Sequence, residues 1–172
     1  MAAAQTRAIS LTEMTANRNL LSILEKIQYA HLTRLLTTGG LVISATKTKA
    51  KIANTIKYLI AGNIYTKATA DMAVLAGTVA ADLFGAWYFF IDTAGTITTV
   101  AGTLTAATLE AIVPPLTSFD GSKACIGMVI VNPTGTGDFV GGTTELDDAT
   151  VVPNAVYVDF VSPYNPNLIT LP

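Results

Sequence analysis

The stretch Trp87-Tyr88-Phe89-Phe90-Ile91-Asp92-Thr93-Ala94-Gly95-Thr96-Ile97 decides the fold, because an aromatic and apolar run ends in a turn and a second strand pattern follows. Aromatic and β-branched residues favour strands. Asp92 and Gly95 bracket a short type I turn with a left-handed exit. The segment therefore predicts a β-hairpin whose first strand is buried.

The rest of the chain from Leu41 repeats this pattern, with a period near two and many Thr, Val and Ile residues. A second hairpin is expected between Tyr58 and Tyr65, with Gly62 and Asn63 as the turn residues that tolerate positive φ. Several short strands at this spacing predict a mainly β fold, either an antiparallel β-sandwich or a jelly-roll-like barrel. The expected strands are Leu41 to Thr46, Ile52 to Ile60, Ile64 to Thr69, Ala86 to Asp92, Thr96 to Ala101, Lys123 to Asn132 and Ala155 to Val161.

The two ends of the chain differ from this β domain, residues 41–161. Residues 1–16 have no periodicity and are expected to form an N-terminal arm. Asn17 can cap one amphipathic α-helix that runs through about Leu36, so residues 1–40 are interpreted as a docking and oligomerisation segment. Residues 162–172 contain three prolines and are expected to form an extended tail. The helix interface is predicted to contain Leu20, Leu24, Ile27, His31 and Leu35.

The composition favours a protein that assembles. Hydrophobic residues make up 51% of the 172 residues and charged residues only 13%. A typical soluble domain has about 25% charged residues. A monomer with so little charge would expose sticky surface, so contacts between subunits are expected to cover it.

The few charges are unevenly distributed. The chain up to Lys67 carries a net charge of +7, and the chain from Ala68 onward carries −9. The basic residues proposed to dock on an acidic surface are Arg7, Arg18, Arg34, Lys47, Lys49 and Lys51. Strand alternation would place the three lysines on one face, as a basic ridge. An acidic protein partner explains this ridge, and so does a solvated edge that blocks unwanted strand pairing. Nucleic acid is not expected as a partner, because the whole chain is acidic and no aromatic residues alternate with the lysines.

No constellation of catalytic groups is found, so the protein is not expected to be an enzyme and no cofactor is expected. His31 is the one histidine and Cys125 the one cysteine, and Cys125 is interpreted as a small buried hydrophobe. Glu145, Asp147 and Asp148 could bind calcium, but no EF-hand spacing surrounds them, so a solvated loop is favoured and no metal is expected. The glycine-rich segment 132–142 fits neither phosphate-loop pattern.

Membrane insertion and secretion are also disfavoured. The stretch Met72 to Ile91 has the length of a membrane span, but it contains Asp82 and is bracketed by Asp71 and Asp92. The first residues hold no apolar run preceded by positive charge, so no secretory signal is expected. Synthesis in the cytoplasm is therefore expected from the sequence.

A series of short turn and strand motifs runs from about Lys51 to Asp159. The pieces are Ile56 to Gly62, Lys67 to Asp71, Tyr88 to Asp92, Ala94 to Ile97, Ala124 to Gly127, Asp138 to Leu146 and Tyr157 to Asp159. The order of these pieces resembles a family of tailed-bacteriophage virion proteins, which are small and β-rich. The resemblance leaves the N-terminal arm and helix uncovered and has no catalytic residues to carry over. It implies a virion component, and we interpret the role as that of a capsid decoration or cement protein, a homotrimer seated on the outer shell and bound to the major capsid protein or another virion protein.

Two other functions stay open at this point. The chain could form the base of a head fibre or tail fibre, joined through its helix to a longer shaft, although no shaft-forming repeat is present. It could also be a carbohydrate-binding module that uses Trp87, Tyr88 and Tyr164 as stacking platforms. The apolar surroundings of Trp87 and Tyr88 favour a place in the core instead.

Overall fold

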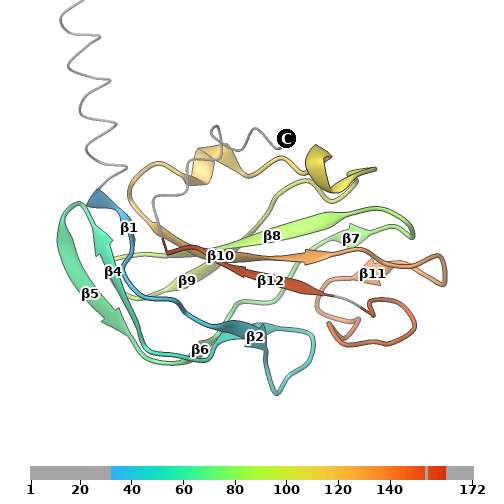
Figure 1. The fold of residues 1–172 in the computed structure, drawn as a ribbon, viewed down its shortest axis with the longest axis horizontal. Helices are drawn as coiled ribbons and strands as arrows, with labels where there is room; N and C mark the ends of the chain where they lie inside the picture. The colour runs from blue at the N-terminus through green and yellow to red at the C-terminus, as the bar shows by residue number, and fades with distance from the viewer. Residues whose placement is uncertain (1–31, 154, 162–172) are drawn as a thin grey trace, which may run out of the picture.

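The computed structural model describes residues 32–153 and 155–161, and its regular structure is almost entirely antiparallel β (Figure 1). Two single-turn 3-10 helices, η1 (Leu109–Ala111) and η2 (Leu116–Ser118), interrupt the strands. In chain order the strands are β1 (Arg34–Leu35), β2 (Leu41–Ile43), β3 (Ala50–Ile52), β4 (Ile56–Ile60), β5 (Asn63–Lys67), β6 (Ala70–Asp71), β7 (Thr78–Val79), β8 (Gly85–Ile91), β9 (Ile97–Ala101), β10 (Ala124–Val131), β11 (Phe139–Val140) and β12 (Val156–Asp159).

The strands form four antiparallel sheets. The largest has four strands in the order β12-β10-β8-β9. Two sheets have three strands each, in the orders β1-β4-β5 and β2-β3-β6, and β11 pairs with β7. In Figure 1 the β1-β4-β5 sheet lies at one end of the molecule, and the loops around β11 lie at the other.

Strand β8 is buried along its whole length because both faces of its sheet are covered. Trp87, Phe89 and Ile91 belong to the main core cluster, whereas Ala86, Tyr88 and Phe90 belong to a second cluster on the opposite face. Alternating side chains of a strand point to opposite faces, so a strand covered on both faces has no polar position. This is why Met72 to Ile91 ends in an unbroken apolar run. In the described residues, none of the helices has the length and the apolar composition that a bilayer crossing requires.

Strand β10 contributes side chains to the same two clusters, and a β-bulge sets which side chains face each cluster. The pairing with β8 shifts register between Cys125 and Gly127. Ala124 and Ile126 face the main core before the shift, and Val129 and Val131 face it afterwards. Without the extra residue, the period of two would turn Val129 and Val131 to the opposite face.

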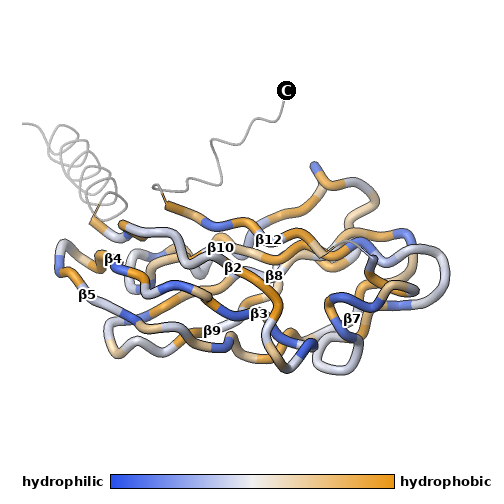
Figure 2. Tube along the Cα trace, turned by 60° about the horizontal axis from the view of Figure 1, so that its bottom comes forward, coloured by the Kyte–Doolittle hydropathy of each residue, from blue (hydrophilic) through white to orange (hydrophobic). Residues whose placement is uncertain are grey.

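The main core draws side chains from several sheets. Ile52 of β3, Ile56 and Tyr58 of β4, and Leu35 of β1 are almost fully buried in the same cluster as Trp87 and Phe89. The hydropathy-coloured trace shows apolar segments along β2, β8 and β10 (Figure 2). Side chains of the four-stranded sheet and of the two three-stranded sheets therefore belong to one core cluster.

Both predicted hairpins form, and one differs in its turn. In the β8–β9 hairpin, Gly95 has φ +77° and its N–H donates to the carbonyl of Asp92 at 3.0 Å, which confirms the predicted turn. In the β4–β5 hairpin, Ile60 pairs with Asn63, so the turn residues are Ala61 and Gly62, with φ of 49° and 82°. The prediction of Gly62 and Asn63 was wrong by one residue, since Ala61 occupies the first left-handed position.

The N-terminal prediction needs one correction. Arg34–Leu35 form strand β1 and not the last turn of a helix, with Leu35 paired to Tyr58. Leu35 is 1% exposed and packs in the main core. Its burial against β4 therefore overrides the helical spacing that predicted Leu35 as part of a helix interface. The other proposed helix-interface residues, Leu20, Leu24, Ile27 and His31, lie outside the described residues, as do the arm (1–16) and the tail (162–172).

Candidate functional site

The basic residues proposed for docking do not form one ridge. Arg7 and Arg18 lie outside the described residues. Arg34 is in β1 and Lys51 is in β3, whereas Lys47 and Lys49 lie in the turn between β2 and β3, where the N–H of Lys49 donates to the carbonyl of Thr46 at 2.9 Å. The expectation of a strand ridge was wrong because the chain turns between Ile43 and Ala50, and the alternation that it assumed does not exist there.

Lys47 has acidic partners within the chain. Its Nζ lies 3.0 Å from Asp147 and 3.6 Å from Glu145. The hydrogen bond to Asp147 and the charges of both carboxylates raise the pKa of Lys47 above its usual value. The contact joins the β2–β3 turn to the loop after β11, where the N–H of Leu146 also donates to the carbonyl of Lys47 at 2.9 Å. Part of the charge asymmetry along the sequence is therefore neutralised inside the fold.

The acidic residues Glu145, Asp147 and Asp148 all interact with other groups of the same chain. Asp148 accepts hydrogen bonds from the N–H groups of Thr150 and Val151 at 2.8 and 3.1 Å, which fixes the turn that follows it. Glu145 and Asp147 face Lys47. No group of three or more metal-ligating side chains is found in residues 32–153 and 155–161.

The outer face of the β1-β4-β5 sheet has a different character. Arg34 lies opposite Leu59, Leu59 opposite Ile64, and Lys57 opposite Thr66, so these five side chains share the face that points away from buried Leu35 and Tyr58. We call this set (Arg34, Lys57, Leu59, Ile64 and Thr66) the basic apolar face. Ile64 is 67% exposed, the highest value among the large hydrophobic residues that the structure describes.

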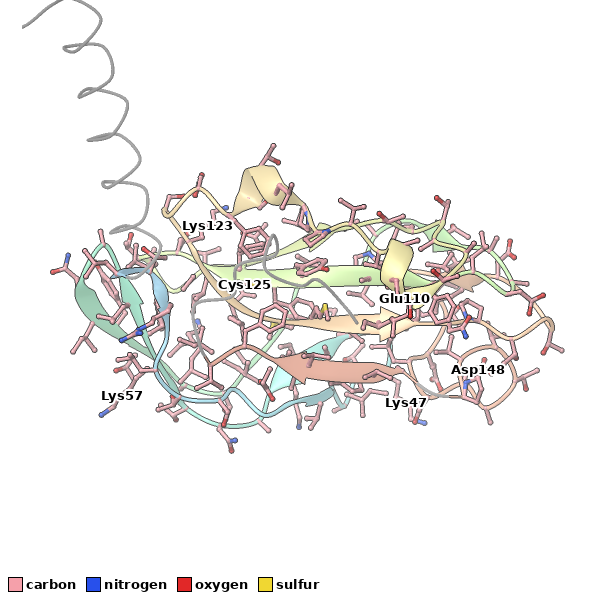
Figure 3. All side chains as sticks on the ribbon, turned by 45° about the horizontal axis from the view of Figure 1, so that its top comes forward. Lys47, Lys57, Glu110, Lys123, Cys125 and Asp148 are labelled. Carbon is pink, nitrogen blue, oxygen red and sulfur yellow. The ribbon has the colours of Figure 1, made fainter. Side chains whose placement is uncertain are left out.

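The positive charge of the basic apolar face is not neutralised locally. No acidic residue occurs between Glu25 and Asp71 in the sequence. Among the ion pairs of the described residues, none includes Arg34 or Lys57. The Nε of Arg34 is buried and has no hydrogen-bond partner in the part of the chain that the structure describes. Lys57 stands at the β4–β5 end of the molecule, far from Lys47 and Asp148 (Figure 3).

The aromatic residues considered as sugar platforms are in the core. Trp87 and Tyr88 are 0% and 2% exposed, and the indole Nε1 of Trp87 donates to the carbonyl of Ala76 at 2.9 Å. These two residues cannot stack on a sugar from solution. Tyr164 lies outside the described residues.

Cys125 lies on the second face of the four-stranded sheet. It packs with Met128 and Ile130 against Tyr88 and Phe90, although the residue as a whole is partly exposed. Burial raises the pKa of the Cys125 thiol well above its ordinary range. A thiol that stays protonated is a poor nucleophile, which supports its interpretation as a packing residue.

Sequence reasoning named Arg34 as a docking residue but missed its neighbours on the face. The alternation of Lys57 and Leu59 with buried Ile56, Tyr58 and Ile60 was available as a signal. What the sequence did not reveal was β1, which places Arg34 beside Leu59. Without knowledge of that pairing, the sequence places Lys57 and Ile64 only in the β4–β5 hairpin and gives no reason to group them with Arg34.

Comparisons of the chain with protein-family models, with curated proteins and with solved structures found no match.

Proposed function

We propose that this chain is a non-enzymatic structural protein of a tailed-phage virion that decorates and stabilises the capsid. In this proposal it self-assembles as a homotrimer and docks on the major capsid protein or another virion protein. Its place is the capsid surface, after synthesis in the cytoplasm of the host bacterium. It needs no cofactor, metal, nucleic acid or membrane for this role.

The observation that carries the proposal is the basic apolar face. Protein interfaces combine exposed apolar side chains with arginine, and large exposed apolar residues beside unpaired cations are typical of a surface that a partner covers. Ile64 and Leu59 supply the apolar part of the face, and Arg34 and Lys57 supply the charge. An acidic, partly apolar protein surface is complementary to both.

The fold is compatible with a structural role of this kind. We propose that the four-stranded sheet and the smaller sheets form the two layers of a β-sandwich, because Leu35, Ile52 and Tyr58 share one core cluster with Trp87 and Phe89. Such a core gives a rigid body that presents its end sheets at fixed positions. A decoration protein needs this rigidity more than it needs a cleft.

Copy number in the particle tests the proposal. Particles of the phage or prophage that encodes the chain would be analysed by electron cryo-microscopy and quantitative mass spectrometry. Hundreds of copies per particle, arranged around lattice symmetry axes, support capsid decoration. A few to a few dozen copies indicate a fibre base instead, and absence from the particle contradicts a virion role.

A further inference from the structure

We propose that the open edge of β5 is the docking site for an extended, acidic segment of the partner protein, which pairs with β5 as an additional strand of the β1-β4-β5 sheet. This inference rests on the proposed function, since the partner is the virion protein on which the chain docks. It specifies the mode of binding and the chemistry of the bound segment.

The first observation is that β5 has one strand neighbour among the described residues. The sheet order is β1-β4-β5, so β4 occupies one side of β5 and its other side is an edge. In Figure 1, β5 forms the outer margin of its end of the molecule. An exposed strand edge carries unpaired N–H and C=O groups that can pair with another chain.

The register identifies which backbone groups face that edge. The carbonyl of Lys57 accepts from the N–H of Leu36 at 2.8 Å, and the N–H of Lys57 donates to Thr37 Oγ1 at 2.8 Å, so the backbone groups of Lys57 point toward β1. Lys57 and Thr66 are therefore a non-hydrogen-bonded pair, and Leu59 and Ile64 are the equivalent pair one step along. The N–H and C=O groups of Ile64 and Thr66 consequently point to the open edge.

The edge lacks the usual protection against pairing. Proteins block exposed edges with proline, bulges or inward-pointing charges. Residues 63–66 include no proline and no charged side chain, and β5 pairs with β4 without a register shift. The single charge of the strand is Lys67 at its end, beside the Gly95 turn. Ile64, next to the hairpin turn, is the exposed apolar side chain that an added strand would cover.

Charge decides what the added strand contains. Adjacent strands are about 4.8 Å apart, so an added strand would lie roughly 10 Å from β4, with only the short side chain of Thr66 between it and Lys57. A lysine and a glutamate together span that distance, which places an acidic residue of the partner within reach of Lys57. A second copy of the basic apolar face would instead bring like charges together.

The undescribed ends of the chain are poorer candidates on composition alone. Residues 1–31 contain three basic and two acidic side chains, and residues 162–172 contain no charged side chain. Neither segment supplies the net negative charge that Lys57 favours. The observations therefore favour a segment from a different protein.

The test uses the full-length chain in purified particles, with two pairs of matched variants. Thr66→Pro removes the edge N–H, whereas Thr66→Ala keeps it. Lys57→Glu reverses a charge of the basic apolar face, whereas Lys123→Glu makes the same change just before β10, at a lysine that was not proposed for docking. We expect Thr66→Pro and Lys57→Glu to lower the particle-bound amount by about tenfold, and the two controls to bind like the unaltered chain. Circular dichroism spectra and melting curves establish that each variant is folded.

Cross-linking identifies the occupant. A zero-length carbodiimide joins a lysine amine to a carboxylate in contact with it, so we expect Lys57 to be linked to an acidic residue of another virion protein. Links from Lys57 only to carboxylates of a second copy of this chain would overturn the inference, and so would a folded Thr66→Pro variant that binds as well as Thr66→Ala. If Thr66→Pro does not fold, Ile64→Asp replaces it, because it keeps the N–H and places a carboxylate where the acidic segment would lie. A chain absent from particles contradicts the proposed function, which is a separate outcome.

Discussion

The carboxylate of Asp159, in β12, accepts the backbone N–H of Leu41, in β2, with distances of 3.2 and 3.1 Å to its two oxygens. The two strands belong to different sheets, so this interaction joins the four-stranded sheet to the β2-β3-β6 sheet. The side chain of Leu41 is 5% exposed, and water has little access to the N–H beside it. The contact fixes how the two sheets meet.

Replacing Asp159 by Ala should destabilise the fold. The N–H of Leu41 would lose its acceptor in a largely buried place, at a cost of about 1–3 kcal/mol. For a chain of this size each kcal/mol lowers the melting temperature by about 2–4 °C. Asp159→Asn keeps an acceptor oxygen and is expected to lose less. Equal melting temperatures for Asp159→Ala and the unaltered chain, measured by calorimetry, would contradict this interpretation of the contact.

Gly127 should be intolerant of a side chain. A Cβ at this position would overlap the carbonyl oxygen of Val158 and lie 2.5 Å from Cδ1 of Leu41. Gly127→Ala must therefore push β12 or β2 away from β10, and we expect a loss of at least about 2 kcal/mol in the free energy of unfolding. Gly137→Ala is the matched control, because the nearest atom to its Cβ, in Val151, is 3.8 Å away. A Gly127→Ala variant that unfolds at the same urea concentration as Gly137→Ala would show that the strands can separate at no cost.

The β8–β9 hairpin could be predicted from the sequence because all its determinants are local. Apolar residues fill β8, and Asp92 and Gly95 supply the turn within the same few residues. The bulge in β10 had no such signal. The sequence from Ala124 to Val131 is apolar on both faces, so no alternation reveals where its phase changes.

The candidate site was less predictable than the strands because it depends on contacts between distant residues. Leu35 pairs with Tyr58, and only this pairing makes Arg34 part of the basic apolar face. Lys47 was grouped with the docking residues on charge alone, but its partner Asp147 comes from a loop a hundred positions away. Charge composition identifies basic residues without indicating which of them are already paired.

Tyr157 and Tyr58 should respond in opposite ways to loss of their hydroxyl groups. The hydroxyl of Tyr157 is buried without a hydrogen-bond partner, whereas that of Tyr58 donates to the carbonyl of Asp92 at 3.0 Å. Tyr157→Phe removes an unsatisfied polar group and is expected to leave stability at pH 7 unchanged or slightly higher. Tyr58→Phe leaves the carbonyl unpaired and is expected to cost about 1 kcal/mol. Urea unfolding of both variants measures the difference, and a Tyr157→Phe variant less stable than Tyr58→Phe would contradict it.

Alkaline pH should destabilise the protein through the same residue. Burial, together with the negative charge of Asp147, raises the pKa of Tyr157 from its ordinary value of 10.0 to about 12. The unfolded chain therefore releases this proton at a lower pH than the folded chain. The contribution of this pKa difference to the stability of the fold is complete below about pH 10 and is lost as the pH rises toward about 12. Tyr157→Phe should show a smaller loss of stability over this interval. Parallel pH dependences for the two proteins would contradict the assignment.

Lys47 and Lys57 should differ as docking residues although both are exposed lysines. Lys47 is engaged by Asp147 and Glu145 in its own chain, whereas Lys57 belongs to the basic apolar face and has no ion pair among the described residues. Exposed ion pairs contribute little to stability, so Lys47→Gln and Lys57→Gln should both melt within about 2 °C of the unaltered chain. Only Lys57→Gln is expected to bind particles more weakly, as measured by co-sedimentation at low salt. Weaker binding by Lys47→Gln alone would place the docking surface at the β2–β3 turn.

Removal of residues 1–31 separates assembly from folding. Leu35 and β1 remain in such a variant, so the buried contacts of the β domain are kept and its melting temperature should change by only a few degrees. The predicted helix interface at Leu20, Leu24, Ile27 and His31 is lost, so we expect the mass in solution to fall from three times the chain mass of 17.9 kDa to that of a single shortened chain. Removal of residues 1–40 also deletes β1 and uncovers the backbone of Lys57, and this longer deletion should lower the melting temperature clearly. Light scattering coupled to size-exclusion chromatography measures the mass. A variant lacking residues 1–31 that remains a trimer would show that the β domain holds the subunits together and would contradict the predicted role of the N-terminal segment in assembly.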